Sequence, residues 1–268
     1  MFVEGLLIPF MISRLGWRPV FIILGFTALL WLIPWLAVFP SRLQGAGEVS
    51  TSQRLESVAT VKRPRVVTFN RNLLGICLGF FCFDYYWYLL LTWLPDYLVT
   101  VRHFTLIKAG LTASLPYLIF GLCEPLGGWI ADRLVRRGWD ETRTRKGIIT
   151  VAFLTGLFLI PAARVQSAQG AIALLIAASL VGLSTGNLLV VLQACAPHDQ
   201  VGVWTGFENF AGNIAGVLAP LVTGLLIKYT GSYFPGFALA PIVLVAGLLA
   251  YWFIVGDLAA PNDKARLA

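Results

Sequence analysis

Residues 203–228, VWTGFENFAGNIAGVLAPLVTGLLIK, form the stretch that decides the fold class. This run of 26 residues has one ionisable side chain in its interior, Glu208, and it ends on Lys228. A helix that crosses the hydrocarbon core of a bilayer needs about 20 consecutive, mainly apolar residues. The run is long enough for such a helix. It is continuous rather than alternating, which disfavours a strand of a membrane barrel.

Comparable runs recur along the chain and predict seven membrane-spanning helices in all. The fourth run is short, and we expect its helix to extend on either side. Internal prolines do not disqualify the runs, because neighbouring helices can satisfy the backbone groups that proline frees. The predicted spans are 19–40, 73–100, 107–131, 148–163, 170–195, 203–228 and 233–256.

Residues 1–12 form an apolar segment that is too short to span. Twelve helical residues rise about 18 Å, against a hydrocarbon core of about 30 Å. The segment lacks the basic region and small-residue cleavage site of a signal peptide. We interpret it as the second half of a spanning helix whose first half is missing.

The composition excludes a soluble or disordered protein. Hydrophobic residues make up 58% of the chain and charged residues 12%, with a mean hydropathy of +0.79. Soluble domains carry about 25% charge. The net charge is +7, but the basic residues stand in short clusters between apolar runs, as in membrane proteins, so no nucleic-acid partner is expected. We expect an integral protein of the plasma (inner) membrane that contacts lipid.

Loop charge predicts the orientation of these helices. One set of alternate loops holds 14 of the 20 Lys and Arg residues, so the positive-inside rule makes that side cytoplasmic. The carboxyl terminus is then cytoplasmic, and the polar loop at 41–72 is a linker or lies on the membrane surface. The cytoplasmic segments are 41–72, 132–147, 196–202 and the tail at 257–268.

The ionisable residues well inside the spans are all acidic: Asp84, Glu124 and Glu208, with Glu4 in the partial helix. An ionisable group inside a membrane is costly and is a functional candidate by default. We therefore consider Asp84, Glu124 and Glu208 candidates for proton or ion coupling. For Glu124, the alternative is a protonated group that hydrogen-bonds between helices, and the sequence favours neither reading.

Asp84, Tyr88 and Thr92 fall on one stripe of a helix. Such a polar stripe is expected to face a water-filled cavity. The alternative is an aromatic belt at the membrane interface. Asp84 lies about eleven residues into its span, near mid-depth, and this position favours the cavity.

A second polar stripe lies in the run 203–228, where Thr205, Asn209 and Asn213 are spaced four residues apart. Its amides can bind a polyol or a carboxylate, or they can join helices; a ligand role is favoured for Asn209, and the two roles are equal for Asn213. Glu208 lies about 100° from Asn209, so both face one cavity only if it is wide. The pair Gly212 and Gly216 permits close helix approach.

The remaining reactive side chains offer no catalytic constellation. His103 and His198 lie in loops, and no catalytic dyad, phosphate-binding loop or metal-ligand cluster is recognisable. The four cysteines lie in or beside apolar runs without a CxxC pair, which favours simple packing over a disulfide or zinc site. The sequence predicts no enzyme, no cofactor and no metal. The cysteines are Cys77, Cys82, Cys123 and Cys195.

Four motifs follow one another in a characteristic order. They are Gly16-Trp17-Arg18-Pro-Val-Phe21, Thr92-Trp93-Leu94-Pro95-Asp96-Tyr97-Leu98, Gly128-Trp-Ile-Ala-Asp132-Arg133-Leu-Val-Arg136-Arg137 and Gly206-Phe-Glu208-Asn209-Phe-Ala-Gly212-Asn213-x-x-Gly216. This order resembles the carboxyl half of a major facilitator superfamily transporter. Within that superfamily it is most similar to the anion:cation symporter family, which includes sialin-like, vesicular glutamate, and bacterial hexuronate and galactonate transporters.

The resemblance implies an all-α polytopic bundle: one six-helix lobe at 73–256, helix six at 14–40 and part of helix five at 1–13. It implies proton-coupled symport of a small organic anion, such as a sugar acid, by alternating access. By carry-over, Tyr85, Tyr88, Asn209 and Asn213 line the binding site. Asp132 latches the cytoplasmic gate at the amino end of the fifth helix, within a gate motif that comprises Gly128, Asp132, Arg133, Arg136 and Arg137.

Two departures from the family pattern leave an alternative function open. Val135 replaces a glycine of the gate motif, and Glu208 stands where relatives commonly have a neutral amide. The family's anion-binding arginines lie mainly in the amino-terminal half, which this sequence lacks. The alternative is a half-transporter that does not transport, either a membrane interaction module pairing with a missing amino-terminal half or a second copy, or a decayed fragment.

Overall fold

The computed structural model describes residues 2–38 and 67–258 of the 268-residue chain. The described residues form helices joined by short turns, and no strand occurs among them. Contacts divide the chain into two compact units, 7–67 and 68–268, the second of which includes residues 1–6. Most of the predicted linker at 41–72 and most of the tail at 257–268 lie outside the described residues.

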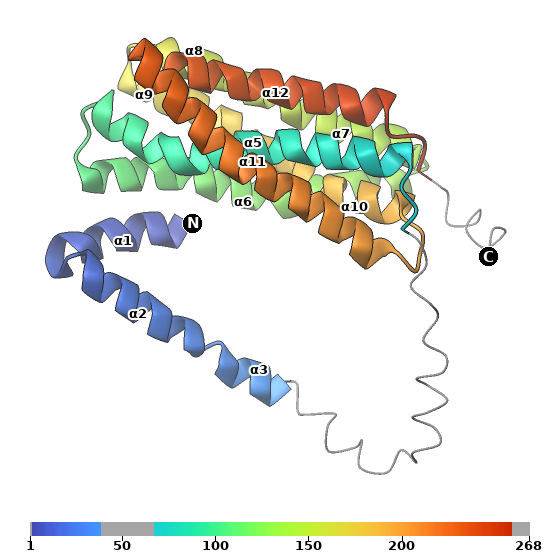
Figure 1. The fold of residues 1–268 in the computed structure, drawn as a ribbon, viewed down its shortest axis with the longest axis horizontal. Helices are drawn as coiled ribbons and strands as arrows, with labels where there is room; N and C mark the ends of the chain where they lie inside the picture. The colour runs from blue at the N-terminus through green and yellow to red at the C-terminus, as the bar shows by residue number, and fades with distance from the viewer. Residues whose placement is uncertain (1, 39–66, 259–268) are drawn as a thin grey trace. The chain divides into compact units, whose positions relative to one another are not determined.

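The amino-terminal helices are α1 (Phe2–Leu15), α2 (Trp17–Leu29) and α3 (Leu32–Val38), labelled in Figure 1. The chain turns between α1 and α2 at Gly16, whose φ of 78° is a conformation that glycine adopts without steric cost. Helices α2 and α3 together give a 20-residue apolar span, Trp17–Leu36.

Six membrane-length segments follow. Together with Trp17–Leu36 they make seven candidate spans in the described chain, as the sequence predicted. The fourth predicted span, 148–163, is indeed longer, at Glu141–Arg164. The segments are α5 (Arg71–Thr100), α6 (Leu106–Arg136), α7 (Glu141–Thr155) continued by η2 (Gly156–Phe158) and α8 (Leu159–Arg164), α9 (Ala168–Ala178) continued by η3 (Ser179–Ser184) and α10 (Thr185–Cys195), α11 (Val201–Thr230) and α12 (Phe234–Phe253).

Polar residues in the loops fix where several helices begin. The side chains of Asn70, Thr105, Asp140 and Ser167 each accept a hydrogen bond from a backbone N–H three residues further on. Such N-caps satisfy donors that the first helical turn leaves free. At the carboxyl end of α11, Gly231 takes a left-handed conformation with φ of 66° and ends the helix.

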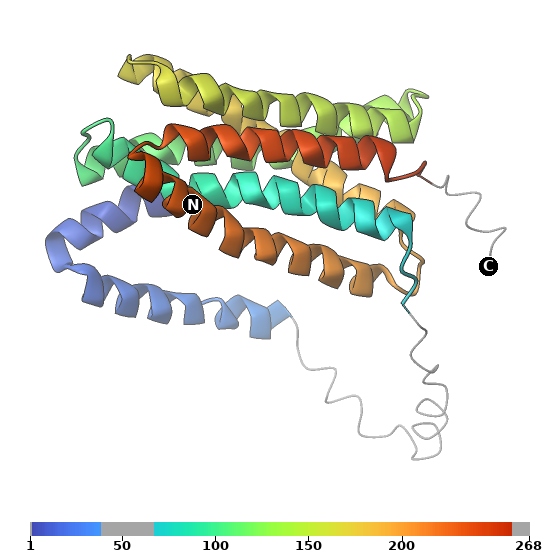
Figure 2. The same cartoon turned by 45° about the horizontal axis from the view of Figure 1, so that its top comes forward.

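Helix α5 is the central helix of the bundle and packs mainly against α11 and α12 (Figures 1 and 2). Tyr86, Leu89 and Leu94 of α5 are fully buried in the core. The contact with α12 is close because Gly79 faces the ring of Tyr251.

Helix α6 approaches η3 backbone to backbone. The position of a Cβ on Gly127 is occupied by the carbonyl oxygen of Leu183. A Cβ on Gly182 would lie 2.5 Å from the carbonyl oxygen of Phe120. Two glycines, one on each element, therefore set the distance between α6 and the middle of the fifth span.

The end of the bundle where α5 finishes is held by Arg102. Its Nε donates to the Tyr97 hydroxyl at 2.8 Å, and its Nη2 donates to the carbonyl oxygens of Val165 at 2.6 Å and Ala162 at 3.1 Å. These carbonyls lie at the end of α8, where a helix leaves its last acceptors free. Arg102 thus ties α5 to the turn between α8 and α9.

We expect the substitution Arg102→Met to lower the free energy of unfolding by about 1–2 kcal/mol, because several charge-assisted hydrogen bonds to partly buried carbonyls are lost. Arg136→Met, at an exposed arginine, is the matched control and should change stability by less than about 0.5 kcal/mol. Unfolding in detergent, followed by tryptophan fluorescence, measures both. Equal stability of the two variants would contradict the role of Arg102.

Candidate functional site

Helix α5 has one open face, and Asp84 lies at its centre. Most of α5 is buried, but Asp84, Trp87 and Tyr88 are only half-buried. A helix turns about 100° per residue, so Trp87 and Tyr88 lie on either side of Asp84, each within about 60° of it. Helix α5 therefore presents a carboxyl group flanked by two aromatic side chains.

Helix α11 borders this open face through two glycines. A Cβ on Gly212 would overlap the Asp84 carboxylate, and a Cβ on Gly216 would lie 2.9 Å from the Tyr88 ring. The close approach that the GxxxG pair permits is used here, and it lets Asp84 and Tyr88 lie directly against α11.

The side chains of Asn209 and Asn213 project from α11 beside this contact. Rotation of about 100° per residue puts both within about 60° of Gly216, on the side where Tyr88 lies. Both side chains are exposed. Asn209 Nδ2 donates to Thr205 O at 3.2 Å, and Asn213 Nδ2 donates to Asn209 O at 2.8 Å. In the described part of the chain neither Oδ1 accepts a hydrogen bond, so each amide keeps an acceptor for a ligand.

Glu208 lies on the inner side of α11 and is only 3% exposed. Glu208 precedes Gly212, the residue that meets the Asp84 carboxylate, by one helical turn of α11. Glu208 Oε1 and the Tyr251 hydroxyl are buried without hydrogen-bond partners among the described residues. Because Asn209 is exposed and Glu208 is buried, the two side chains do not share one surface.

Tyr85 belongs to the core of the bundle. It is 4% exposed, and its hydroxyl has no hydrogen-bond partner in the described chain. Tyr85 directly follows Asp84, so the two side chains point about 100° apart around the helix. Tyr85 therefore does not lie with Tyr88 on the open face. The sequence resemblance grouped the two tyrosines, whereas the structure separates them.

Helix α6 borders the other side of the open face. A cavity of about 350 Å³ is lined by Trp87 of α5 and by Tyr117, Phe120 and Glu124 of α6, among others. Trp87 stacks on Phe120 with ring centroids 4.1 Å apart. Since Trp87 flanks Asp84, Glu124 lies toward the same side of the bundle as Asp84. Two of the three candidate carboxyl groups thus border the open face, and Glu208 is buried behind it.

The gate motif ends α6 and has a partner within the same lobe. Asp132 Oδ1 accepts a hydrogen bond from Arg145 Nη2 at 2.9 Å. Arg145 also donates to Glu141 Oε1 at 2.8 Å and to Asn187 Oδ1 at 3.3 Å. Gly128 faces open space, and Arg133, Arg136 and Arg137 are exposed.

Arg145 and Lys146 are the residues that the sequence analysis missed. Both were counted among the loop charges of the cytoplasmic segment 132–147, but their side chains are buried in the first two turns of α7, which begins at Glu141. Lys146 Nζ donates to the carbonyl oxygen of Val255 at 2.7 Å, at the end of α12. The cap Asp140 followed by Glu141 is the signal that could have placed the helix start earlier.

None of the four cysteines forms a disulfide in the described part of the chain; Cys82 and Cys123 are buried, and Cys77 and Cys195 are half-buried. Among the described residues no group of three or more His, Cys, Asp or Glu side chains could hold a metal ion.

Residues 2–220 match the sequence profile of the Major Facilitator Superfamily. The chain belongs to this superfamily. It is 30% identical to the D-galactonate transporter of Escherichia coli over 264 residues, which cover 91% of this chain and 61% of that one. It is 27% identical to a probable galactarate/D-glucarate transporter of Bacillus subtilis, covering 91% and 57% of the two chains. A probable chloroplastic anion transporter of Oryza sativa is 30% identical, with coverage of 91% and 42%.

These relatives confirm the resemblance to the anion-transporter branch of the superfamily. The chain spans about three fifths or less of their length. A crystal structure of the peptide transporter POT shares the fold, with a TM-score of 0.51 at 18% identity over 80% of this chain and 46% of that one. The protein is an integral membrane protein with the all-α fold of this superfamily.

Proposed function

We propose that this chain is the carboxyl-terminal lobe of a transporter that moves a small organic anion, such as a sugar acid, together with protons. One observation carries the proposal: Asp84 and Tyr88 of α5 pack against α11. The exposed side chains of Asn209 and Asn213 project from the same side of α11. Residues 73–256 form the lobe, 14–40 helix six and 1–13 part of helix five. Residues 41–72 link the lobes, and the tail at 257–268 is cytoplasmic at the inner membrane.

The side chains of the open face suit the hydroxyl groups of a sugar acid. Amide oxygens and a phenol can accept or donate hydrogen bonds to a polyol. The described residues at mid-depth on this face include Asp84 and Glu124 but no Lys or Arg. In our proposal the amino-terminal lobe therefore neutralises the substrate carboxylate. The carboxyl-terminal lobe, which this chain forms, binds the uncharged remainder of the substrate.

The three membrane-embedded carboxyl groups are the proposed proton carriers. A carboxyl group inside the bilayer is tolerated where it faces a cavity or exchanges a proton. Asp84 and Glu124 border the open face, and Glu208 is buried on α11 one helical turn from the residue that meets Asp84. The exposed gate motif at the end of α6 would act at the cytoplasmic mouth in alternating access between the two lobes.

Uptake of labelled galactonate and glucarate into vesicles tests the proposal. The chain is measured alone and co-expressed with the amino-terminal half of the E. coli D-galactonate transporter, whose full-length form is the positive control. We expect uptake that is stimulated by an inward proton gradient in the co-expressed form. Absence of uptake in both forms, while the positive control works, would reject transport.

We expect Asp84→Asn to abolish the gradient-driven component of uptake in that assay while substrate exchange across the membrane persists. The physical reason is that an amide cannot take up or release the coupled proton. Asp257→Asn, which removes an exposed carboxyl group beyond the last helix, is the matched control. Unchanged gradient dependence in Asp84→Asn would exclude Asp84 as the proton carrier.

A second candidate function is that of a membrane interaction module that pairs with another lobe or a second copy. The observation that favours it is the exposed surface of α11, which has the smallest buried share of the six bundle spans. The exposed apolar side chains on its outer face are Val203, Phe210, Val217 and Leu221. Sizing of the purified protein in detergent tests it. A complex larger than the monomer, with no uptake in vesicles, would support this function, and a stable monomer would count against it.

A further inference from the structure

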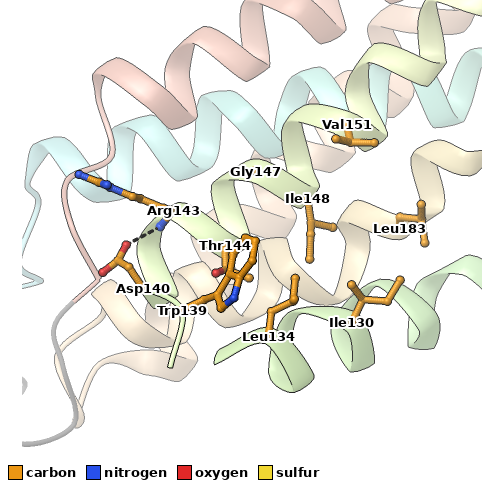
Figure 3. A pocket seen from close by; sticks show the side chains of 10 residues that line it. All are labelled: Ile130, Leu134, Trp139, Asp140, Arg143, Thr144, Gly147, Ile148, Val151 and Leu183. Carbon is orange, nitrogen blue, oxygen red and sulfur yellow. Dashed lines mark hydrogen bonds between the residues drawn. The ribbon is translucent and has the colours of Figure 1, made fainter. Parts of the chain in front are cut away.

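A groove of about 670 Å³ lies between α6 and α7, and its lining contains none of the residues of the open face of α5. Figure 3 shows its apolar walls, formed by Ile130 and Leu134 of α6, Ile148 and Val151 of α7, and Leu183 of η3. The walls belong to candidate membrane-spanning segments, so we expect lipid, and not water, to surround them.

The groove is hollow at Gly147. No atom lies within 4 Å of the position where a Cβ of Gly147 would stand. Along α7, the nine residues from Arg143 to Val151 are separated by eight helical rises, about 12 Å in all. This length approaches the thickness of one leaflet of hydrocarbon, about 15 Å. The hollow thus has the polarity and length to hold the upper part of an acyl chain.

One end of the groove lies at the membrane interface. Trp139 is 61% exposed and lines the groove beside Asp140 and Arg143 (Figure 3). An indole at this position is typical of the headgroup level of a bilayer. In Figure 3 the side chain of Arg143 extends away from the apolar walls, at the end of the groove where Trp139 and Asp140 lie.

This end of the groove carries an excess of positive charge. Arg133, Arg136, Arg137 and Arg143 are exposed, and none of them forms an ion pair within the described chain. Their acidic neighbours are largely engaged. Asp132 and Glu141 pair with Arg145, and the carboxylate of Asp140 accepts the backbone N–H of Arg143 as a helix cap.

We propose that this groove binds an anionic phospholipid, with an acyl chain between α6 and α7 and the phosphate against the arginines at the groove end. Basic pockets between spanning helices at the membrane interface are suited to anionic headgroups. Apolar walls alone would accept any lipid; the unpaired arginines favour a headgroup with net negative charge. The site is separate from the open face of α5, and the proposal does not depend on transport.

Native mass spectrometry of the purified protein, titrated with phosphatidylglycerol and phosphatidylcholine of identical chains, tests the proposal. We expect phosphatidylglycerol to bind at least about tenfold more tightly. The substitution Gly147→Leu fills the hollow and should weaken binding of both lipids about tenfold. Gly25→Leu, at another glycine in open space on α2, adds the same side chain and should leave binding unchanged.

The double substitution Arg137→Gln with Arg143→Gln tests the headgroup contact separately. We expect an approximately 25-fold loss of phosphatidylglycerol affinity, about fivefold for each arginine, with phosphatidylcholine unaffected. Arg14→Gln with Arg18→Gln is the matched control at two other exposed arginines. Equal affinity for the two lipids, or wild-type binding in the Arg137/Arg143 variant, would overturn the proposal, even if Gly147→Leu failed to fold.

Discussion

Replacing Gly127 by leucine is expected to prevent the six-helix lobe from folding, whereas the same replacement at Gly128 should be tolerated. The place of a Gly127 side chain is taken by the backbone carbonyl of Leu183, so neither side can yield without a shift of a whole helix. Overpacking a well-packed site costs about 1–3 kcal/mol, and an overlap with backbone should exceed the upper figure. This is a large part of the roughly 5–15 kcal/mol that stabilises a typical domain.

Gly128 supplies a matched control one residue away. It lies on the same helix at nearly the same depth, and no atom lies within 4 Å of its missing Cβ. Leucine there should even gain about 0.5–1 kcal/mol from its better helix propensity. Monodisperse yield on size-exclusion chromatography and the midpoint of thermal unfolding in detergent measure both variants. Similar behaviour of the two would show that the backbone contact between α6 and η3 does not determine stability.

The substitution Arg145→Met is expected to destabilise the lobe by about 2–3 kcal/mol. Arg145 is 6% exposed and donates to side chains of α6, α7 and α10. Without the guanidinium, the Oδ1 of the fully buried Asn187 loses its donor, and a buried unsatisfied acceptor costs about 1–3 kcal/mol. Asp132 is half-exposed and can turn to water, so its loss of a partner adds less.

Two comparisons separate this role from a general effect of lost charge. Arg143→Met removes a neighbouring exposed arginine and should change stability by less than about 0.5 kcal/mol. Asp132→Ala should cost about 1 kcal/mol, because Arg145 keeps Glu141 and Asn187 as acceptors. Denaturant or thermal unfolding in the same detergent ranks the three variants. A loss in Asp132→Ala that matched the loss in Arg145→Met would place the energy in the ion pair rather than in Asn187.

These contacts connect the gate motif to the core of the lobe. Asp132 was expected to meet the amino end of a helix in the other lobe. Within the described residues its partner is Arg145, which also reaches Asn187 of α10. A carboxylate that is half-exposed and already paired remains accessible to a second partner. The ion pair with Arg145 is therefore compatible with the contact to the fifth helix, which stays a prediction.

The membrane character, the seven spans and the superfamily follow from the amino-acid sequence alone. Several apolar runs of about 20 residues in one chain are stable only inside a lipid bilayer. The number of these runs and the order of the four motifs can be read directly from the sequence. The helix starts at Asn70, Thr105 and Ser167 are likewise local, since each cap contacts a backbone N–H only three residues away.

Which polar groups meet follows from the packed structure and not from the sequence pattern. A helical stripe predicts a face, but not which helix covers it. Asp84 and Tyr88 lie against α11 because Gly212 and Gly216 leave room for them. Tyr85, next to Asp84 on α5, and Glu208, next to Asn209 on α11, turn into the core. From the sequence, Arg145 and Lys146 are counted as charges of a cytoplasmic loop, because their partners in the folded chain lie up to 109 residues away in sequence. Such contacts depend on how the helices pack, which hydrophobic periodicity does not specify.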